Sequence, residues 1–227
     1  MNLVIFDIDG TLANSQEIED HCFKTAFLET LGIDIWSVAW HTLQHVTDWG
    51  ISKEICQKEM QREISESELA TFRVRFIHLL EKACEQDPNL FTEVPGSSSF
   101  FQTLHRHPDY EVAIATGSWS DSARIKLEAI GVPYKEVPLA SSDHFISRED
   151  IVQDAIKKSR DFYAASFEST IYFGDGAWDL KTCQNIAIPF IGVDCNRSGK
   201  LKQLGAPHVI HDYLDQRLVF EIMDTVL

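Results

Sequence analysis

The sequence contains no apolar stretch that approaches the roughly 18 residues needed for a membrane-spanning helix. It also lacks a positively charged segment followed by an apolar one at its start, because a strand-like run already begins at Leu3. Basic residues are few: 20 lysines and arginines stand against 35 acids, and the formal net charge is −15 at pH 7. These absences argue against a membrane or a nucleic acid as the main partner, and we expect a cytoplasmic protein.

The five cysteines lie far apart and form no Cys-x-x-Cys pair, which indicates reduced, mostly buried thiols. His41 and His45 have the spacing of two metal ligands on one helical face, but no third ligand lies near them in the sequence, and we expect a structural role. The chain does contain 44% apolar and 24% charged residues over 227 positions, which is typical of one medium-sized domain or of a domain with a second one inserted.

The most informative segment is the apolar run from Leu3 to Phe6. It ends on Asp7, and Asp9 and Gly10 follow within three positions. A short apolar run bounded by a turn signal is typical of a strand buried on both faces of a parallel sheet. Ligands of open α/β sheets collect at the carboxyl ends of such strands, so we expect Asp7 to lie where a reaction can take place.

Residues 16–87 show no strand pattern, and apolar residues recur there at helical spacing. Ser65 and Glu68 fit a capping box at the start of the last helix of this segment, and Asp87-Pro88 ends that helix. The helical stretches are residues 18–31, 35–45, 51–62 and 65–87. We expect these four helices to form a small bundle inserted into the rest of the chain.

Strands and helices alternate after Val94-Pro95-Gly96. The expected strands are residues 112–115, 137–140, 171–173, 190–193 and 208–210. The expected helices cover residues 97–106 and 121–130 and begin near residues 147, 177 and 198. This alternation predicts a doubly wound, mostly parallel, Rossmann-like α/β sheet with right-handed crossovers. We therefore expect an α/β core domain, residues 1–15 and 94–227, and an inserted helical domain, residues 16–93.

Polar residues follow three of the expected strands: Asp7 and Asp9 come after the first, Thr116 after the second, and Asp175 and Asp179 after the fourth. Acids brought together without bases repel one another by about 4 kcal/mol for each close pair, at an effective dielectric constant of about 20, unless a cation joins them. Mg²⁺ prefers one or two carboxylates, several waters and a phosphate oxygen. The set therefore predicts a phosphoryl-transfer site.

In these features the sequence resembles the haloacid dehalogenase-like hydrolases, and the resemblance covers nearly the whole chain. The matching motifs, in order, are Asp7-Ile8-Asp9-Gly10-Thr11, the hydroxyl residue Thr116, and the acidic stretch Gly174-Asp175-Gly176-Ala177-Trp178-Asp179. The resemblance implies that the inserted helical domain is a cap over the active site.

The resemblance also implies roles for these residues. Asp7 attacks phosphorus to form an aspartyl-phosphate, and Asp9 acts as general acid for the leaving oxygen and then as base for water. Mg²⁺ is bound by Asp7, by Asp175 and by the backbone carbonyl of Asp9, and Asp179 holds the waters of the metal or a neighbouring residue. Thr116 takes part in catalysis, and the implied substrate-binding neighbours are Gly10, Thr11 and Gly117.

The third motif of the family, usually a lysine that opens a helix upstream of the acidic motif, is where the chain departs from the pattern. Arg148 lies 27 residues before Asp175, at an expected helix start where backbone N–H groups favour an anion. Lys157 and Lys158 lie further along that helix and are the alternatives. We assign the role to Arg148, because a guanidinium can hold phosphate oxygens bidentately.

The resemblance implies a Mg²⁺-dependent phosphatase acting on a small phosphorylated metabolite. A β-phosphoglucomutase-like phosphomutase has the same acids and is an alternative, although Thr11 favours hydrolysis. A binding protein of the same fold without turnover is a further alternative, and the missing lysine is its support. In the cap, Thr47 and Asp48 either reach the substrate or form an ordinary turn at a helix boundary.

Overall fold

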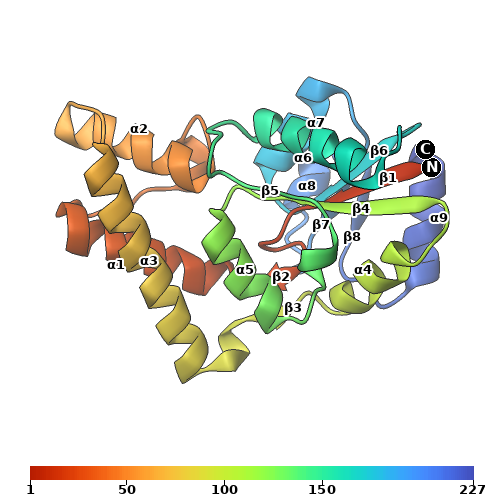
Figure 1. Cartoon of the computed structure of the whole chain (residues 1–227), viewed down its shortest axis with the longest axis horizontal. Helices are drawn as coiled ribbons and strands as arrows, with labels where there is room; N and C mark the ends of the chain where they lie inside the picture. Colours follow the sequence, from red (N-terminus) through yellow and green to blue (C-terminus); the bar gives the residue numbers. More distant parts are fainter.

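The computed structural model describes all 227 residues, and a six-stranded sheet lies at the centre of its α/β part (Figure 1). Across the sheet the strands are β5 (Leu139–Ala140), β4 (Tyr110–Ala115), β1 (Asn2–Phe6), β6 (Thr170–Gly174), β7 (Phe190–Val193) and β8 (His208–Ile210). Every neighbouring pair is parallel. The predicted parallel α/β sheet is therefore confirmed, with the N-terminal strand in its middle.

Helices cover both faces of this sheet (Figure 1). One face carries α4 (Ser97–His105), α5 (Ser120–Ala129) and α9 (Gln216–Val226), and the other carries α6 (Arg148–Tyr163), α7 (Ala177–Ile186) and α8 (Lys200–Gln203). β1 supplies both apolar cores, because Val4 and Phe6 face the first and Leu3 and Ile5 the second, all fully buried. This double burial explains why β1 is an uninterrupted apolar run.

Three helices stand beside the sheet, at the left in Figure 1: α1 (Gln16–Leu31), α2 (Asp48–Met60) and α3 (Glu66–Gln86). α1 and α3 pack along each other through an aromatic cluster in which Phe23 and Phe27 meet Phe72 and Phe76. The capping box predicted at the start of α3 is present. We call these helices and their connections the helical insert.

The prediction of a helix at residues 35–45 is wrong. This stretch contains a single 3₁₀ turn, Trp40–Thr42, so three α-helices and not four form the helical insert. The indole N–H of Trp40 donates to Asp20 of α1 at 2.7 Å, and the Thr42 hydroxyl donates to the Ala39 carbonyl at 2.7 Å. A tertiary anchor and a local side-chain to backbone bond thus replace the helical hydrogen bonds that the apolar spacing suggested.

Two short strands join the helical insert to the α/β part. β2 (Ala13–Asn14) and β3 (Thr92–Glu93) pair antiparallel where the chain enters and leaves the insert, and Asn14 Nδ2 adds a hydrogen bond of 3.0 Å to the Glu93 carbonyl. The sequence predicts neither strand, because two residues are too few to show a period. It also misses α9. None of the helices combines the length and the apolar character that crossing a membrane requires.

Candidate active site

The carboxyl ends of the three central strands meet at one edge of the sheet. Asp7 follows β1, Thr116 follows β4 and Asp175 follows β6, and the strand order β4-β1-β6 makes these ends neighbours. The backbone N–H of Asp7 donates to the Phe173 carbonyl of β6 at 2.9 Å, which ties two of the ends together. The sheet therefore gathers residues that are far apart in the chain.

Asp7, Asp175 and Asp179 form an acidic cluster in which one carboxylate oxygen of each lies within 4.8 Å of the others. Asp7 and Asp179 are buried, and Oδ1 of Asp7 has no hydrogen-bond partner. Burial raises the pKa of Asp7 to about 7, and burial together with the neighbouring carboxylates raises the pKa of Asp175 well above its usual range. Oxygen donors with one orphaned buried atom fit a hard divalent cation.

Gly10 allows the cluster to close. Its φ of 72° lies in the left-handed region, and a Cβ at this position would collide with the side-chain amide of Gln16 and the carboxylate of Asp175. Gln16 Nε2 instead donates to Asp175 Oδ2 at 3.1 Å. The turn after Asp9 therefore requires glycine both for its backbone angle and for the approach of these two side chains.

Arg148 is the first residue of α6, the helix start that the sequence predicted. Its Nη1 donates to Asp179 Oδ1 at 2.7 Å and lies 3.5 Å from Asp7 Oδ1, and its Nε donates to the Val46 carbonyl at 3.1 Å. Its Nη2 donates to no protein group and lies where a Cβ on Gly117 would be 2.7 Å away. The guanidinium is thus held firmly and keeps one arm for an anion beside Asp7.

Asp179 is the anchor of this arginine. It is fully buried, its Oδ1 also accepts a hydrogen bond of 3.3 Å from the Tyr172 hydroxyl, and its Oδ2 accepts one of 2.9 Å from the Gly176 N–H. Lys158, by contrast, donates to the Leu139 carbonyl on the outer strand β5. Of the three basic residues considered for the third motif, Arg148 alone lines the cavity described below.

Asp9 belongs to a second buried group of charges. Lys126 of α5 is fully buried, and its Nζ donates to Asp9 Oδ2 at 2.5 Å, to Glu19 Oε1 at 2.6 Å and to the Ser118 hydroxyl at 2.8 Å. The Ser15 hydroxyl donates to the other Asp9 oxygen. Burial alone would raise the pKa of Asp9, but the Lys126 ammonium and the hydrogen bonds to the Asp9 carboxylate together outweigh burial and lower it. Because Glu19 comes from α1, this group also links the helical insert to the α/β part.

A cavity of about 490 Å³ lies over these groups, between the strand ends and the helical insert. The predicted site residues that line it are Asp7, Asp9, Thr47, Asp48, Gly117, Arg148 and Asp175. The predicted residues Gly10, Thr11, Thr116 and Asp179 do not line it. Thr11 is fully buried with an unpartnered hydroxyl, and the Thr116 hydroxyl accepts a hydrogen bond of 3.1 Å from the Ser118 N–H.

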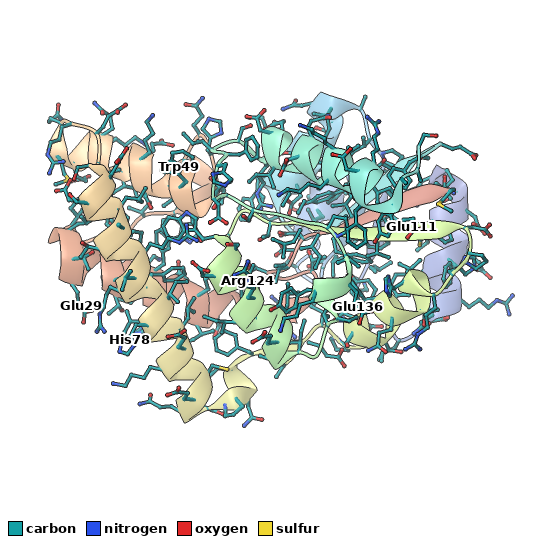
Figure 2. All side chains as sticks on the ribbon, viewed as in Figure 1. Glu29, Trp49, His78, Glu111, Arg124 and Glu136 are labelled. Atoms are coloured by element: carbon teal, nitrogen blue, oxygen red, sulfur yellow. The ribbon has the colours of Figure 1, made fainter.

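Thr47 and Asp48 form the turn at which α2 begins. The Thr47 hydroxyl accepts a hydrogen bond of 3.0 Å from the Gly50 N–H and so caps the helix. The Asp48 carboxylate accepts one of 2.8 Å from the Trp119 N–H, in the loop after β4. Figure 2 shows Trp49 at this same end of α2, next to the α/β part. The helix-boundary turn is therefore present, and it also docks α2 and contributes to the wall of the cavity.

Sequence reasoning missed Lys126, Glu19 and Gln16. A signal existed for Lys126, because it shares the buried face of α5 with Ala123 and Leu127. An ionised side chain on such a face needs charged partners. No comparable signal marks Glu19 and Gln16, whose partners lie 107 and 159 residues away in the chain.

Comparisons with known proteins agree with the fold. Residues 4–193 match a family model described as haloacid dehalogenase-like hydrolase. A sequence comparison with curated proteins gives no significant match.

Three solved structures illustrate the likeness of fold. A hydrolase from Pseudomonas syringae is 21% identical, with a TM-score of 0.75 and 98% of this chain and 99% of the other covered. A family IA hydrolase from Entamoeba histolytica is 17% identical, with a TM-score of 0.73 over 100% and 99% of the two chains. CbbY from Rhodobacter sphaeroides, a mutant crystallised with xylulose 1,5-bisphosphate, is 16% identical, with a TM-score of 0.70 over 94% and 95%. With the family model matching most of its length, the chain belongs to the haloacid dehalogenase-like hydrolases.

Proposed function

We propose that the protein is a Mg²⁺-dependent phosphatase that hydrolyses a small cytosolic phosphomonoester through an aspartyl-phosphate on Asp7. One observation carries this proposal: Asp7 is a buried carboxylate with an unpartnered oxygen, it lies 3.5 Å from Arg148 Nη1 and close to two further acids, and it lines a cavity. Membership of a hydrolase family supports it.

In this proposal Asp7, Asp175 and the backbone carbonyl of Asp9 hold the Mg²⁺ ion. Bound Mg²⁺ would offset the repulsion between the Asp7 carboxylate and the phosphate and would polarise the phosphoryl group. Asp179 has its oxygens committed to Arg148, Tyr172 and Gly176, so its contribution is to fix Arg148 and to add negative charge beside the ion.

The protein residues then divide the reaction between them. Arg148 binds a phosphate oxygen through Nη2 and orients the phosphorus towards Asp7. Asp7 forms a bond to phosphorus while the bond to the leaving oxygen breaks, and Asp9 gives that oxygen its proton. Asp9 next takes a proton from water, which attacks phosphorus and frees phosphate and the Asp7 carboxylate. Gly117, which lines the cavity, is the remaining phosphate contact in this proposal, and Gly10, Thr11 and Thr116 support the site from behind its lining.

The pairing of Asp9 with Lys126 bears on these two proton transfers. The ammonium keeps Asp9 ionised, and this is the state that the second, base-catalysed step needs. The first step needs a protonated Asp9, so in this account Asp9 leaves Lys126 and takes up a proton when substrate binds.

We further propose that residues 16–93 act as a cap and that residues 1–15 and 94–227 act as the catalytic core. The pairing of β2 with β3 puts both crossings between the two parts side by side, so a small change there would move the whole insert. The first turns of α1 line the cavity, and in this proposal their side chains face the leaving group once the cap closes.

The test is phosphate release from p-nitrophenyl phosphate by the full chain, with Mg²⁺ and with EDTA. We expect turnover that requires Mg²⁺ and falls by about 10³-fold or more in Asp7→Asn, because the amide lacks the nucleophilic charge. The exposed Asp161 of α6 provides a matched control, and Asp161→Asn should keep the wild-type rate. Equal rates for Asp7→Asn and wild type would contradict the proposal.

A further inference from the structure

The part of the cavity that would hold the leaving group is lined by more acidic than basic side chains. Seven of the lining residues are acids and two, Lys24 and Arg148, are basic. Without the groups of the phosphoryl end, which are Asp7, Asp9, Asp175 and Arg148, four acids and Lys24 remain. Three of the acids, Glu17, Glu19 and Asp20, belong to the first turns of α1, which form one wall of the cavity. A leaving group bound beside these residues meets mostly negative charge.

Neither base is free to hold a second anion. Lys24 Nζ forms an ion pair of 2.9 Å with Asp20 and lies 4.9 Å from the ring centre of Trp40, which itself donates to Asp20. Arg148 is bound to Asp179 and faces Asp7, so it serves the phosphoryl group. Both cations are therefore already neutralised or committed.

The third cation of this region, Lys126, cannot contact a ligand in the cavity. Lys126 has no exposed side-chain surface, does not line the cavity and donates to Asp9, Glu19 and Ser118. Glu17, by contrast, is exposed and forms no ion pair. Phe23, Trp40 and Trp178 also line the cavity, and aromatic faces attract cations and polarisable C–H groups rather than anions.

We propose that the substrates are phosphomonoesters whose leaving alcohol is neutral or positively charged, such as phosphorylated polyols and amino sugars, and that a second phosphate or a carboxylate on the leaving group is rejected. This inference rests on the proposed phosphatase function and narrows it. It also disfavours a phosphomutase, because a bisphosphate intermediate needs a cation at both ends. The fold itself does not decide this, since CbbY, crystallised with xylulose 1,5-bisphosphate, shares it.

A matched series of sugar phosphates tests the proposal. We expect Mg²⁺-dependent kcat/KM for glucose 6-phosphate and glucosamine 6-phosphate to exceed that for 6-phosphogluconate and fructose 1,6-bisphosphate by about tenfold or more, the effect of one added like charge at close range. An equal or higher value for either anionic ester would overturn the inference.

A charge-reversing variant tests whether the acidic side chains of α1 cause this substrate preference. Glu17→Lys should narrow the preference for glucose 6-phosphate over 6-phosphogluconate by about tenfold, because it puts an unpaired cation on the α1 wall. Glu66→Lys makes the same change in the first turn of α3, outside the cavity, and should leave the preference unchanged. The same response in both variants would show that overall charge, and not the cavity wall, sets the preference.

Binding separates this inference from the proposed function. Asp7→Asn with Mg²⁺ can be titrated calorimetrically with the same four esters, and we expect the two without a second anion to bind more tightly. Absence of turnover in wild type together with this order of affinities would overturn the phosphatase proposal alone. Tighter binding of 6-phosphogluconate, or no binding of any ester, would overturn the inference.

Discussion

At the scale of single residues, Asp7 and Asp9 lie two positions apart and have opposite surroundings. Asp7 has an oxygen without a hydrogen-bond partner, and burial raises its pKa to about 7. Asp9 accepts hydrogen bonds on both oxygens, and these bonds together with the Lys126 charge outweigh burial and lower its pKa. Two carboxylates whose environments push their pKa values apart are suited to different tasks, which agrees with a nucleophile and a proton-transfer group.

Lys126 offers the first prediction at this scale. In Lys126→Met the carboxylates of Asp9 and Glu19 stay buried without their cation, so we expect the free energy of unfolding to fall by about 3–5 kcal/mol. Urea unfolding followed by circular dichroism measures this change. Lys82→Met, on the exposed side of α3, should alter the same quantity by less than about 0.5 kcal/mol. A Lys126→Met protein as stable as wild type would show that the pairs contribute nothing.

What the sequence could predict of the site follows from strand ends and helix starts. Asp7, Thr116 and Asp175 each come directly after a strand whose apolar run is visible, and Arg148 opens a helix whose cap residue is visible. The pairing of Lys126 with Asp9 could not be predicted, because it depends on how α5 packs against the loop that follows β1. A sequence pattern indicates on which face of a helix or strand a side chain lies, but not which other element that side chain contacts.

At the scale of elements, Trp119 joins the two parts of the molecule. It belongs to the loop between β4 and α5, yet its buried ring packs with Phe72 and Phe76 of α3 at 5.7 and 6.1 Å between ring centres. Arg73 of α3 lies 5.4 Å from the same ring centre. The core of the helical insert is therefore completed by a residue of the α/β part.

We expect Trp119→Ala to lower the free energy of unfolding by about 3–5 kcal/mol, because it removes a large buried ring and leaves a cavity between the two parts. It should also raise KM for p-nitrophenyl phosphate, since the insert would dock less well over the strand ends. Urea unfolding and steady-state kinetics measure the two effects. The half-exposed Trp36 of the insert is the control, and Trp36→Ala should have a much smaller effect on both. Trp119→Ala with unchanged stability and KM would refute the role given to this ring.

Elements with a clear hydrophobic or capping pattern could be predicted, whereas very short strands and segments fixed by tertiary contacts could not. β1, β4 and β6 show continuous apolar runs, and α3 carries its capping box in the sequence. The helix expected at residues 35–45 failed because Trp40 is tied to α1, a contact that no local pattern contains. The pairing of β2 with β3 joins segments 78 to 80 positions apart and is equally invisible locally.

At the scale of the whole molecule, a buried carboxyl group with a raised pKa makes stability depend on pH. Burial raises the pKa of Asp48 to about 7 from its ordinary value of 3.8. The folded protein therefore binds this proton more tightly than the unfolded chain does. Between about pH 4 and 7 the contribution of Asp48 favours the folded state less and less as pH rises, by up to about 1.4 kcal/mol for each pH unit.

The corresponding prediction compares wild type with Asp48→Asn, both in EDTA, by urea unfolding across this pH range. The amide keeps an oxygen that can accept the Trp119 N–H but has no proton to lose. We therefore expect wild type to lose stability relative to the variant as pH rises from 4 towards 7. Two curves that run parallel would contradict the raised pKa.

The most direct test of the account is to look for the phosphoryl group on Asp7. p-Nitrophenol leaves without help from an acid, whereas the second step needs Asp9 as base, so Asp9→Asn given p-nitrophenyl phosphate and Mg²⁺ should accumulate the phosphorylated enzyme. After acid quenching and proteolysis, mass spectrometry should find one added phosphoryl group on the peptide that contains Asp7, and none in Asp7→Asn. Phosphate release with that peptide unmodified in every quenched sample, or a phosphoryl group on another residue, would contradict the account.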